Sequence, residues 1–178
     1  MTLPDQYNWL TKETGPKMLV AALKYYGLKE VPGSADNPTI MKWAHDFGIT
    51  WYEHDSIAWC SLFMGQVAKD AGYAPPNKNQ LLAAVSWTNW GRGLANRYLG
   101  AIMVFNRPGG HHVGLYIGED NDSFYVLGGN TGDAVAIARI AKGRLIAIRW
   151  PNEERLPDPN GRKEIILASS GALSQNEA

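Results

Sequence analysis

Apolar side chains recur at helical spacing through the first half of the chain. In residues 16–26, for example, Met18, Leu19, Ala22 and Leu23 share one helical face. The segment that follows begins with Asn37-Pro38, a good N-cap and first-turn pair. The pattern predicts four helical segments: 16–26, 37–48, from near 56 to 72, and a shorter piece at 79–85.

The second half has the pattern of short strands rather than helices. Its apolar runs are rich in Val, Ile, Tyr and Phe and are separated by Gly, Asn and Asp turns. Connections this short favour antiparallel pairing, because parallel strands need long crossovers. Helices followed by strands predict an α+β domain. The expected strands are 101–105, 112–118, 123–127, 134–140 and 145–150.

The chain of 178 residues fits one domain with a core of its own. We expect this domain to span 1–151, with a helical part at 1–90 and a β-rich part at 100–151. Residues 152–178 are dominated by Pro, charged and small side chains. That composition predicts an extended or partly disordered tail, loosely attached to the domain.

Charge argues against several classes of partner. The chain has 17 basic and 17 acidic residues, spread evenly over both halves. Nucleic-acid and anionic-membrane binding normally rest on a basic patch, so neither is expected. No apolar run approaches the roughly 20 residues of a membrane-spanning helix, and the first residues lack the features of a signal peptide. We therefore expect a monomer made in the cytoplasm, without membrane insertion.

Cys60 is the first candidate for chemistry, because it is the one cysteine and lies in the first turn of the third predicted helix. The positive end of a helix dipole stabilises a thiolate, and the free N–H groups there can hold an oxyanion. The alternative is a buried structural cysteine that packs as a small apolar side chain.

Two adjacent histidines open the second predicted strand, and they cannot serve the same site because neighbouring strand residues point to opposite faces. His112 shares a face with Gly114, Tyr116 and Gly118, and the two glycines would permit a helix end carrying a nucleophile to approach closely. His112 is therefore the candidate base. His111 is expected at the surface beside the turn.

A third polar group is needed to fix the imidazole of a Cys–His pair. Asn130 follows the next strand, in Gly128-Gly-Asn-Thr-Gly132, although the same sequence is also typical of an ordinary turn. Asp133, Glu119 and Asp120 are alternative orienting groups, the last two at the far end of the His112 strand.

Together these segments resemble a known group of enzymes. The order of Trp59-Cys60-Ser-Leu-Phe63, Gly100 to Gly118 with its His-His-Val-Gly core, and Val126-Leu-Gly-Gly-Asn130 is similar to the three blocks of the CHAP and NlpC-type cysteine hydrolases of bacterial cell walls. Glu30-Val-Pro-Gly33 with Asn37-Pro38 resembles a phage and bacterial branch of that group. Ala58 replaces a frequent Pro, and His111 replaces a frequent Gly.

The resemblance implies a papain-like fold, with the N-terminal helices packed on a C-terminal antiparallel sheet. It implies that Cys60 is the nucleophile, His112 the base and Asn130 the orienting group, without a metal or organic cofactor. The implied substrate is peptidoglycan, cut either between peptide residues or at the N-acetylmuramoyl-L-alanine amide. Five residues are candidates for substrate binding, from their place beside the nucleophile or in a loop that could wall a groove: Asp55, Trp59, Trp87, Trp90 and His111.

Two other classes of function compete with a cysteine hydrolase. One is a non-catalytic cell-wall-binding module or phage tail structural module, although the chain keeps Cys60, His112 and Asn130. The other is a zinc amidase, which the absence of a His-Glu-x-x-His motif disfavours. A lytic enzyme made without a signal would act on the wall after release beside a holin, from a virion, or through a secretion machine. Delivery as a toxin would imply an immunity protein.

Overall fold

The structure is a computed structural model that describes residues 2–33, 35–157, 164–175 and 177. Within these residues the α-helices are α1 (Lys17–Leu23), α2 (Pro38–Asp46) and α3 (Cys60–Asp70), and the short 3-10 helices are η1 (Asp5–Lys12), η2 (Ala84–Asn89) and η3 (Lys142–Arg144). The strands are β1 (Arg92–Gly93), β2 (Ile102–Arg107), β3 (Gly110–Glu119), β4 (Ser123–Gly128), β5 (Ala136–Ala141) and β6 (Leu145–Trp150). The α+β class is confirmed.

The six strands form one antiparallel sheet in the order β1-β6-β2-β3-β4-β5. Strands β5 and β6 are consecutive in the chain and yet are separated by three others in the sheet. Four residue steps reach at most about 14 Å, whereas four strand spacings in a flat sheet cover about 19 Å. The sheet must therefore curl, so that it has an outer face and an inner face.

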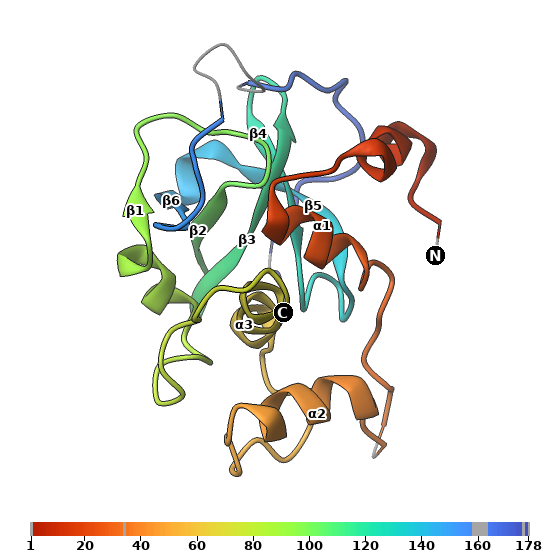
Figure 1. Cartoon of the computed structure of the whole chain (residues 1–178). Coiled ribbons are helices and arrows are strands. Elements are labelled where there is room, and N and C mark those ends of the chain that lie inside the picture. The colour runs from red at the N-terminus through yellow and green to blue at the C-terminus, as the bar shows by residue number, and fades with distance from the viewer. Residues whose placement is uncertain (1, 34, 158–163, 176, 178) are drawn as a thin grey trace.

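Each face of the sheet has its own apolar core. On the outer face, Val113, Leu115 and Ile117 of β3 pack with α3 and the other helices. The inner face buries a second cluster, which comes mostly from the strands themselves and includes Phe105 and Tyr116. Figure 1 shows α1 and α3 against one side of the sheet, with α2 further out.

The helix and strand limits differ from expectation mainly at helix ends. Helix α2 begins as predicted, since the Asn37 side chain accepts a hydrogen bond from the Thr39 N–H at 2.8 Å. Helix α3 begins at Cys60 rather than near Ser56, because Trp59 adopts φ −121° and ψ 13° and so lies outside the helix. The segment predicted at 79–85 forms turns and the start of η2, and β1 was not predicted.

The segment after β6 is extended, as expected, but its described part is firmly hydrogen-bonded to the sheet. The Glu119 N–H donates to the Ile165 carbonyl, and the Leu167 N–H donates to the Glu119 carbonyl, both at 2.8 Å. Further along, the Ser174 N–H donates to the Arg139 carbonyl at 2.8 Å. The prediction of a loose attachment therefore does not hold for residues 164–175. Part of that prediction, residues 158–163, lies outside the described residues.

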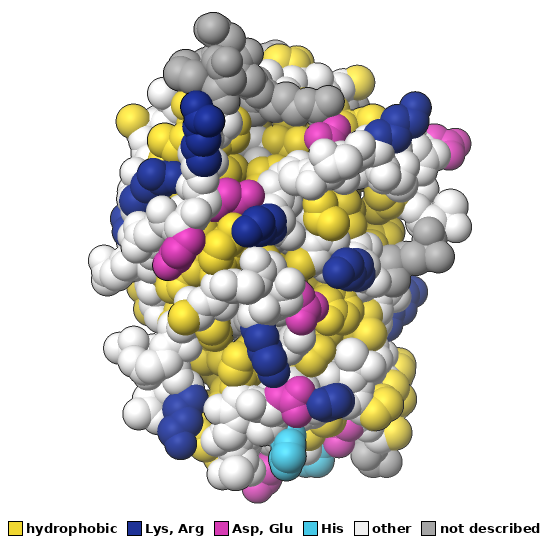
Figure 2. All heavy atoms as spheres, in the orientation of Figure 1, with side chains coloured by type: hydrophobic (Ala, Val, Ile, Leu, Met, Phe, Trp, Pro, Cys, Tyr) yellow, Lys and Arg dark blue, Asp and Glu magenta, His cyan; other side chains and the backbone are white. Residues whose placement is uncertain are grey.

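The surface carries no strongly charged region in the view of Figure 2, where basic and acidic side chains alternate across the molecule. This agrees with the neutral, evenly spread sequence. In the part of the chain that the structure describes, no helix is long and apolar enough to cross a membrane.

Candidate active site

Cys60 occupies the first position of α3, and its side chain is 3% exposed. Burial raises the pKa of the thiol, while the Val113 N–H directed at the sulfur and the positive charge of Arg107 lower it. The Ser61 N–H at the helix start acts in the same direction. Burial outweighs these effects, so that the thiol is neutral at rest while the groups that would stabilise a thiolate are already in place.

His112 lies on the inner face of the sheet, opposite to α3. It pairs with Phe105 across β2 and β3, and both side chains are fully buried. The space beside Gly128 receives its ring, since a Cβ atom built on Gly128 would lie 2.8 Å from His112 Nε2. The expectation that the glycine face of β3 receives the Cys60 helix is therefore wrong. Val126 fills the space at Gly114, and the extended segment after β6 fills the space at Gly118.

The protonation state of His112 follows from its burial, which lowers its pKa to about 4. The negative charge of Glu177 raises the pKa, and the positive charges of Arg107 and Arg144 lower it further. Neither ring nitrogen has a hydrogen-bond partner among the described residues. The imidazole is therefore neutral at pH 7 and free to accept a proton.

The thiol and the imidazole lie on opposite faces of β3. Sulfur contacts the N–H of Val113, the residue directly after His112. The His112 ring lies on the other side of this strand, beside the end of β4 at Gly128. No Cys60–His112 hydrogen bond is formed in this resting state. Catalytic hydrogen bonds in enzymes without substrate are often long and tighten when the substrate binds.

Asn130 does not orient His112. Its side-chain oxygen accepts a hydrogen bond from the Trp59 N–H at 3.0 Å, and its side-chain nitrogen donates to Glu30 Oε1 at 3.1 Å. Asn130 has φ 56°, a backbone conformation that Asn tolerates better than most residues. It instead fixes Trp59, the residue that precedes Cys60, and so positions the start of α3.

Glu30 is a site residue that the sequence reasoning did not single out. Its Oε1 accepts hydrogen bonds from Asn130 and, at 2.5 Å, from the Trp59 indole N–H. Burial raises the pKa of Glu30, and the nearby acidic residues Asp133 and Asp55 act in the same direction. The sequence did contain a sign that Glu30 belongs to the site, because Glu30 is the first residue of the Glu-Val-Pro-Gly segment that carries part of the family resemblance.

Several of the predicted substrate-binding residues are structural. Trp59 is fully buried against Trp43 and Phe63. Asp55 is buried, and its Oδ2 accepts hydrogen bonds from the N–H groups of Val31 and Asn37 at 3.0 and 2.7 Å. These side chains hold the loops around Cys60 in place and offer no surface to a substrate.

The predicted Trp87–Trp90 wall is also largely internal. Trp87 is fully buried, and its indole N–H donates to Oγ of Ser61, the residue after Cys60, at 2.8 Å. Trp90 is half-buried and donates to the Ala74 carbonyl. Trp51 is the exposed tryptophan, at 60%, in the loop whose next residue, Tyr52, lies near Cys60. Its sequence context gives no sign of this exposure.

The remaining candidates are His111, Glu119 and Asp120. His111 is partly exposed, as expected, and alternation along β3 directs it to the same face as Val113. Glu119 and Asp120 lie at the far end of β3, where they pair with Arg97 and Arg139 at 2.6 and 2.7 Å. They cannot orient His112. Among the described residues, no three His, Cys, Asp or Glu side chains are grouped as metal ligands.

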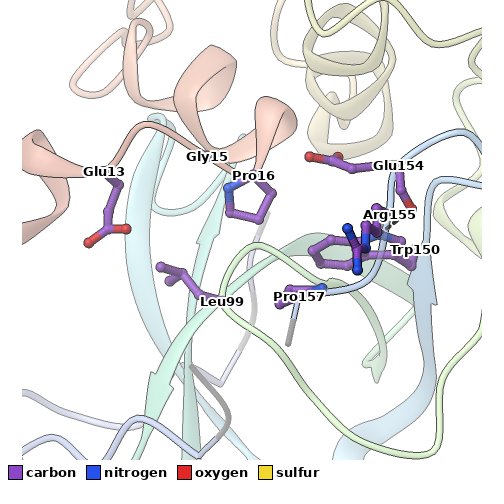
Figure 3. Close-up of a pocket in the computed structure, with 8 residues that line it drawn as sticks. All are labelled: Glu13, Gly15, Pro16, Leu99, Trp150, Glu154, Arg155 and Pro157. Carbon is purple, nitrogen blue, oxygen red and sulfur yellow. Dashed lines mark hydrogen bonds between the residues drawn. The ribbon is translucent and has the colours of Figure 1, made fainter. Parts of the chain in front are cut away.

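A separate cavity of about 330 Å³ lies at the junction of the Gly15-Pro16 turn with the end of β6. Figure 3 shows Pro16 and Leu99 in the middle of the pocket, with Glu13 on one side and Glu154, Arg155 and Trp150 on the other. The Glu154 carboxylate is already used, since it accepts hydrogen bonds from the Lys17 N–H and the Tyr73 hydroxyl. This cavity shares no lining residue with the Cys60 site.

Gly129 is required by the close approach of β4 to α3, which yields a stability prediction. A Cβ atom there would lie 2.6 Å from Phe63 Cβ and 2.7 Å from Trp59 Cζ3. Gly129→Ala should therefore lower the free energy of unfolding by about 1–3 kcal/mol through overpacking. Chemical denaturation measures this, with Gly143→Ala as the matched control because a Cβ atom on Gly143 meets nothing within 4 Å. Equal stability of the two variants would contradict the packing described.

No protein-family model matches the chain, and no curated protein matches it significantly.

Proposed function

We propose that this protein is a cysteine hydrolase that cleaves an amide bond of peptidoglycan. The observation that carries the proposal is the contact between Cys60 sulfur, at the first position of α3, and the N–H of the residue that follows His112. A helix start and a backbone donor thus lie at the one thiol of the chain, and His112 is the residue before that donor. The proposal includes a papain-like arrangement of the helix and the sheet.

The proposed reaction begins when substrate brings the imidazole of His112 within reach of the thiol. His112 removes the proton, and the thiolate attacks the carbonyl carbon of the amide. The free N–H groups at the start of α3 can hold the oxyanion. The imidazolium then protonates the leaving amine, and water activated by the neutral imidazole hydrolyses the thioester. Asn130 and Glu30 serve this sequence by fixing the Trp59–Cys60 peptide.

Peptidoglycan is proposed as the substrate on the strength of the ordered sequence blocks around Cys60, His112 and Asn130. The bond would be either a peptide bond of the stem or the amide between muramic acid and L-alanine. The proposal places the activity at the cell wall, reached after release or delivery. A holin, a secretion machine or an immunity protein would then belong to the biology of this chain.

The first test is digestion of purified sacculi, followed by mass spectrometry of the soluble products. We expect the wild type to release fragments with one new kind of amine terminus. The identity of that amine shows which amide bond was cleaved. Cys60→Ser should reduce the rate by about a thousandfold or more, because serine lacks the intrinsic nucleophilicity of the thiol in this setting. Thermal unfolding of both proteins controls for folding.

Two outcomes would overturn the proposal. If Cys60→Ser digested walls at the wild-type rate, the thiol would not be the nucleophile. If the wild type sedimented with sacculi without releasing any fragment, the chain would be the non-catalytic wall-binding module considered above.

A further inference from the structure

The segment after β6 ends its described path at the candidate base. It runs beside β5, the last strand of the sheet, where the Ser174 N–H donates to the Arg139 carbonyl at 2.8 Å. Beyond this point Glu177 is 1% exposed. A carboxylate so deeply buried needs strong compensation, because desolvation penalises its charge.

Arg144 supplies that compensation. Two of its guanidinium nitrogens donate to the two oxygens of Glu177, at 2.8 and 2.5 Å. This is the paired geometry in which arginine recognises carboxylates. Burial alone would raise the pKa of Glu177, but hydrogen bonds from Arg144 and from the Ser174 side chain, with a smaller effect of His112, bring it below its usual range.

The guanidinium is also anchored independently of Glu177. Arg144 Nε donates to the Asn106 carbonyl at 2.7 Å, in the strand that pairs with the start of β3. Asn106 is adjacent to Phe105, the cross-strand partner of His112. The guanidinium of Arg144 is therefore anchored to β2 near the strand position opposite His112, and it also donates to the Ser174 carbonyl at 3.2 Å.

The surroundings of His112 complete the argument. The charged groups that act on its ring are Glu177, Arg107 and Arg144. Both ring nitrogens are buried without a hydrogen-bond partner among the described residues. A polar group left this way at a site is expected to gain a partner in another state of the molecule. In this structure Glu177 is close enough for its charge to act on the ring, while its oxygens are bound to Arg144.

We propose that Arg144 is a carboxylate-binding subsite of the active site, and that Glu177 of the same chain fills it as an internal inhibitor. The substrate carboxylate would displace Glu177, detach Leu173 and Ser174 from β5 and open the way to His112. This inference rests on the proposed function for its substrate. Stem peptides fit the chemistry, because they carry free carboxylates on their D-glutamyl and terminal D-alanyl residues.

The test uses the full chain with Glu177→Gln, and Glu164→Gln as the matched control. Glu164 belongs to the same segment, is largely exposed and pairs with Arg97, away from the site. We expect the Ser174 amide to exchange with deuterium at least about tenfold faster in Glu177→Gln, and unchanged in Glu164→Gln. Wall digestion by Glu177→Gln should show kcat/KM raised by about tenfold, mainly through KM, because the competing internal ligand is lost.

A second measurement examines the subsite without any turnover. A synthetic peptide of residues 172–178 should bind to the Glu177→Gln protein in calorimetry, while the same peptide with Gln at position 177 should not. Adding Arg144→Gln to the Glu177→Gln protein should abolish peptide binding. These results do not depend on catalysis, so they stand even if the hydrolase proposal fails.

Two results would overturn the inference. If Glu177→Gln lowered kcat/KM while the Ser174 amide stayed protected, Glu177 would be a positioning group for His112 rather than an inhibitor. If the wild-type peptide failed to bind to the Glu177→Gln protein, Arg144 would not be a carboxylate subsite.

Discussion

Replacing His112 by Gln should reduce wall digestion by about a thousandfold or more, whereas His111→Gln should change it by less than about threefold. Removal of a general base from a pair that acts as a unit costs almost the whole catalytic effect. The two histidines are adjacent, but they occupy different environments: His112 is buried with no hydrogen-bond partner among the described residues, and His111 is partly exposed.

The digestion rates of the two variants can be compared directly, because each variant is the control for the other. Both substitutions remove an imidazole from the same strand, and the stability of each variant is measured as well, because His112 is fully buried and His111 is partly exposed. The measurement is kcat/KM on soluble muropeptides at pH 7, with circular dichroism to verify folding. If His111→Gln were the inactive variant, the base would be the histidine on the same face as Val113 and α3, and the assignment of His112 would be wrong.

Acidification from pH 6.5 to 4.5 should cost the wild type about 2–3 kcal/mol of stability through His112 alone. Its pKa is about 4 in the folded protein, compared with an ordinary value of 6.5. Because the folded-state pKa is depressed, the unfolded chain binds the proton first as the pH falls. The stability contribution is complete above pH 6.5 and is lost progressively down to about pH 4, at about 1.4 kcal/mol per pH unit.

Urea unfolding of the wild type and His112→Gln across this pH range measures the effect. The variant lacks the titrating group, so the difference in free energy of unfolding between the two proteins should change by about 2–3 kcal/mol between pH 6.5 and 4.5. Glu30, whose raised pKa stabilises the fold on acidification, titrates in both proteins and cancels. A difference that is independent of pH would mean that His112 is not buried in the neutral form.

The sequence predicted the fold class well because the signals are local. Helical spacing, the Asn37-Pro38 start and the short turns between strands each depend on a few neighbouring residues, and they appear in the structure. The start of α3 was misplaced by about four residues, because Ser56 to Trp59 are helix-compatible in sequence. Their conformation is decided by long-range contacts such as Asn130 to the Trp59 N–H, across 71 positions.

The contacts of the site residues were harder to predict, because the type of a polar residue does not determine which group it hydrogen-bonds to. The polarity of Asn130 was recognised, but its role was assigned to the wrong neighbour. Trp59 and Trp87 were taken for substrate contacts, while their indole N–H groups are satisfied inside the protein by Glu30 and Ser61. The position of Glu177 could not be predicted, since it depends on one ion pair at the end of an extended segment.

The buried, protonated state of Cys60 also has a chemical consequence outside catalysis. Peroxides and thiol reagents attack the thiolate, and they need access to it. The single thiol of this chain is buried, and its raised pKa keeps it protonated. An enzyme that worked at the bacterial surface would meet oxidants from host cells and from air, and this arrangement would keep its sulfur reduced until a substrate arrived.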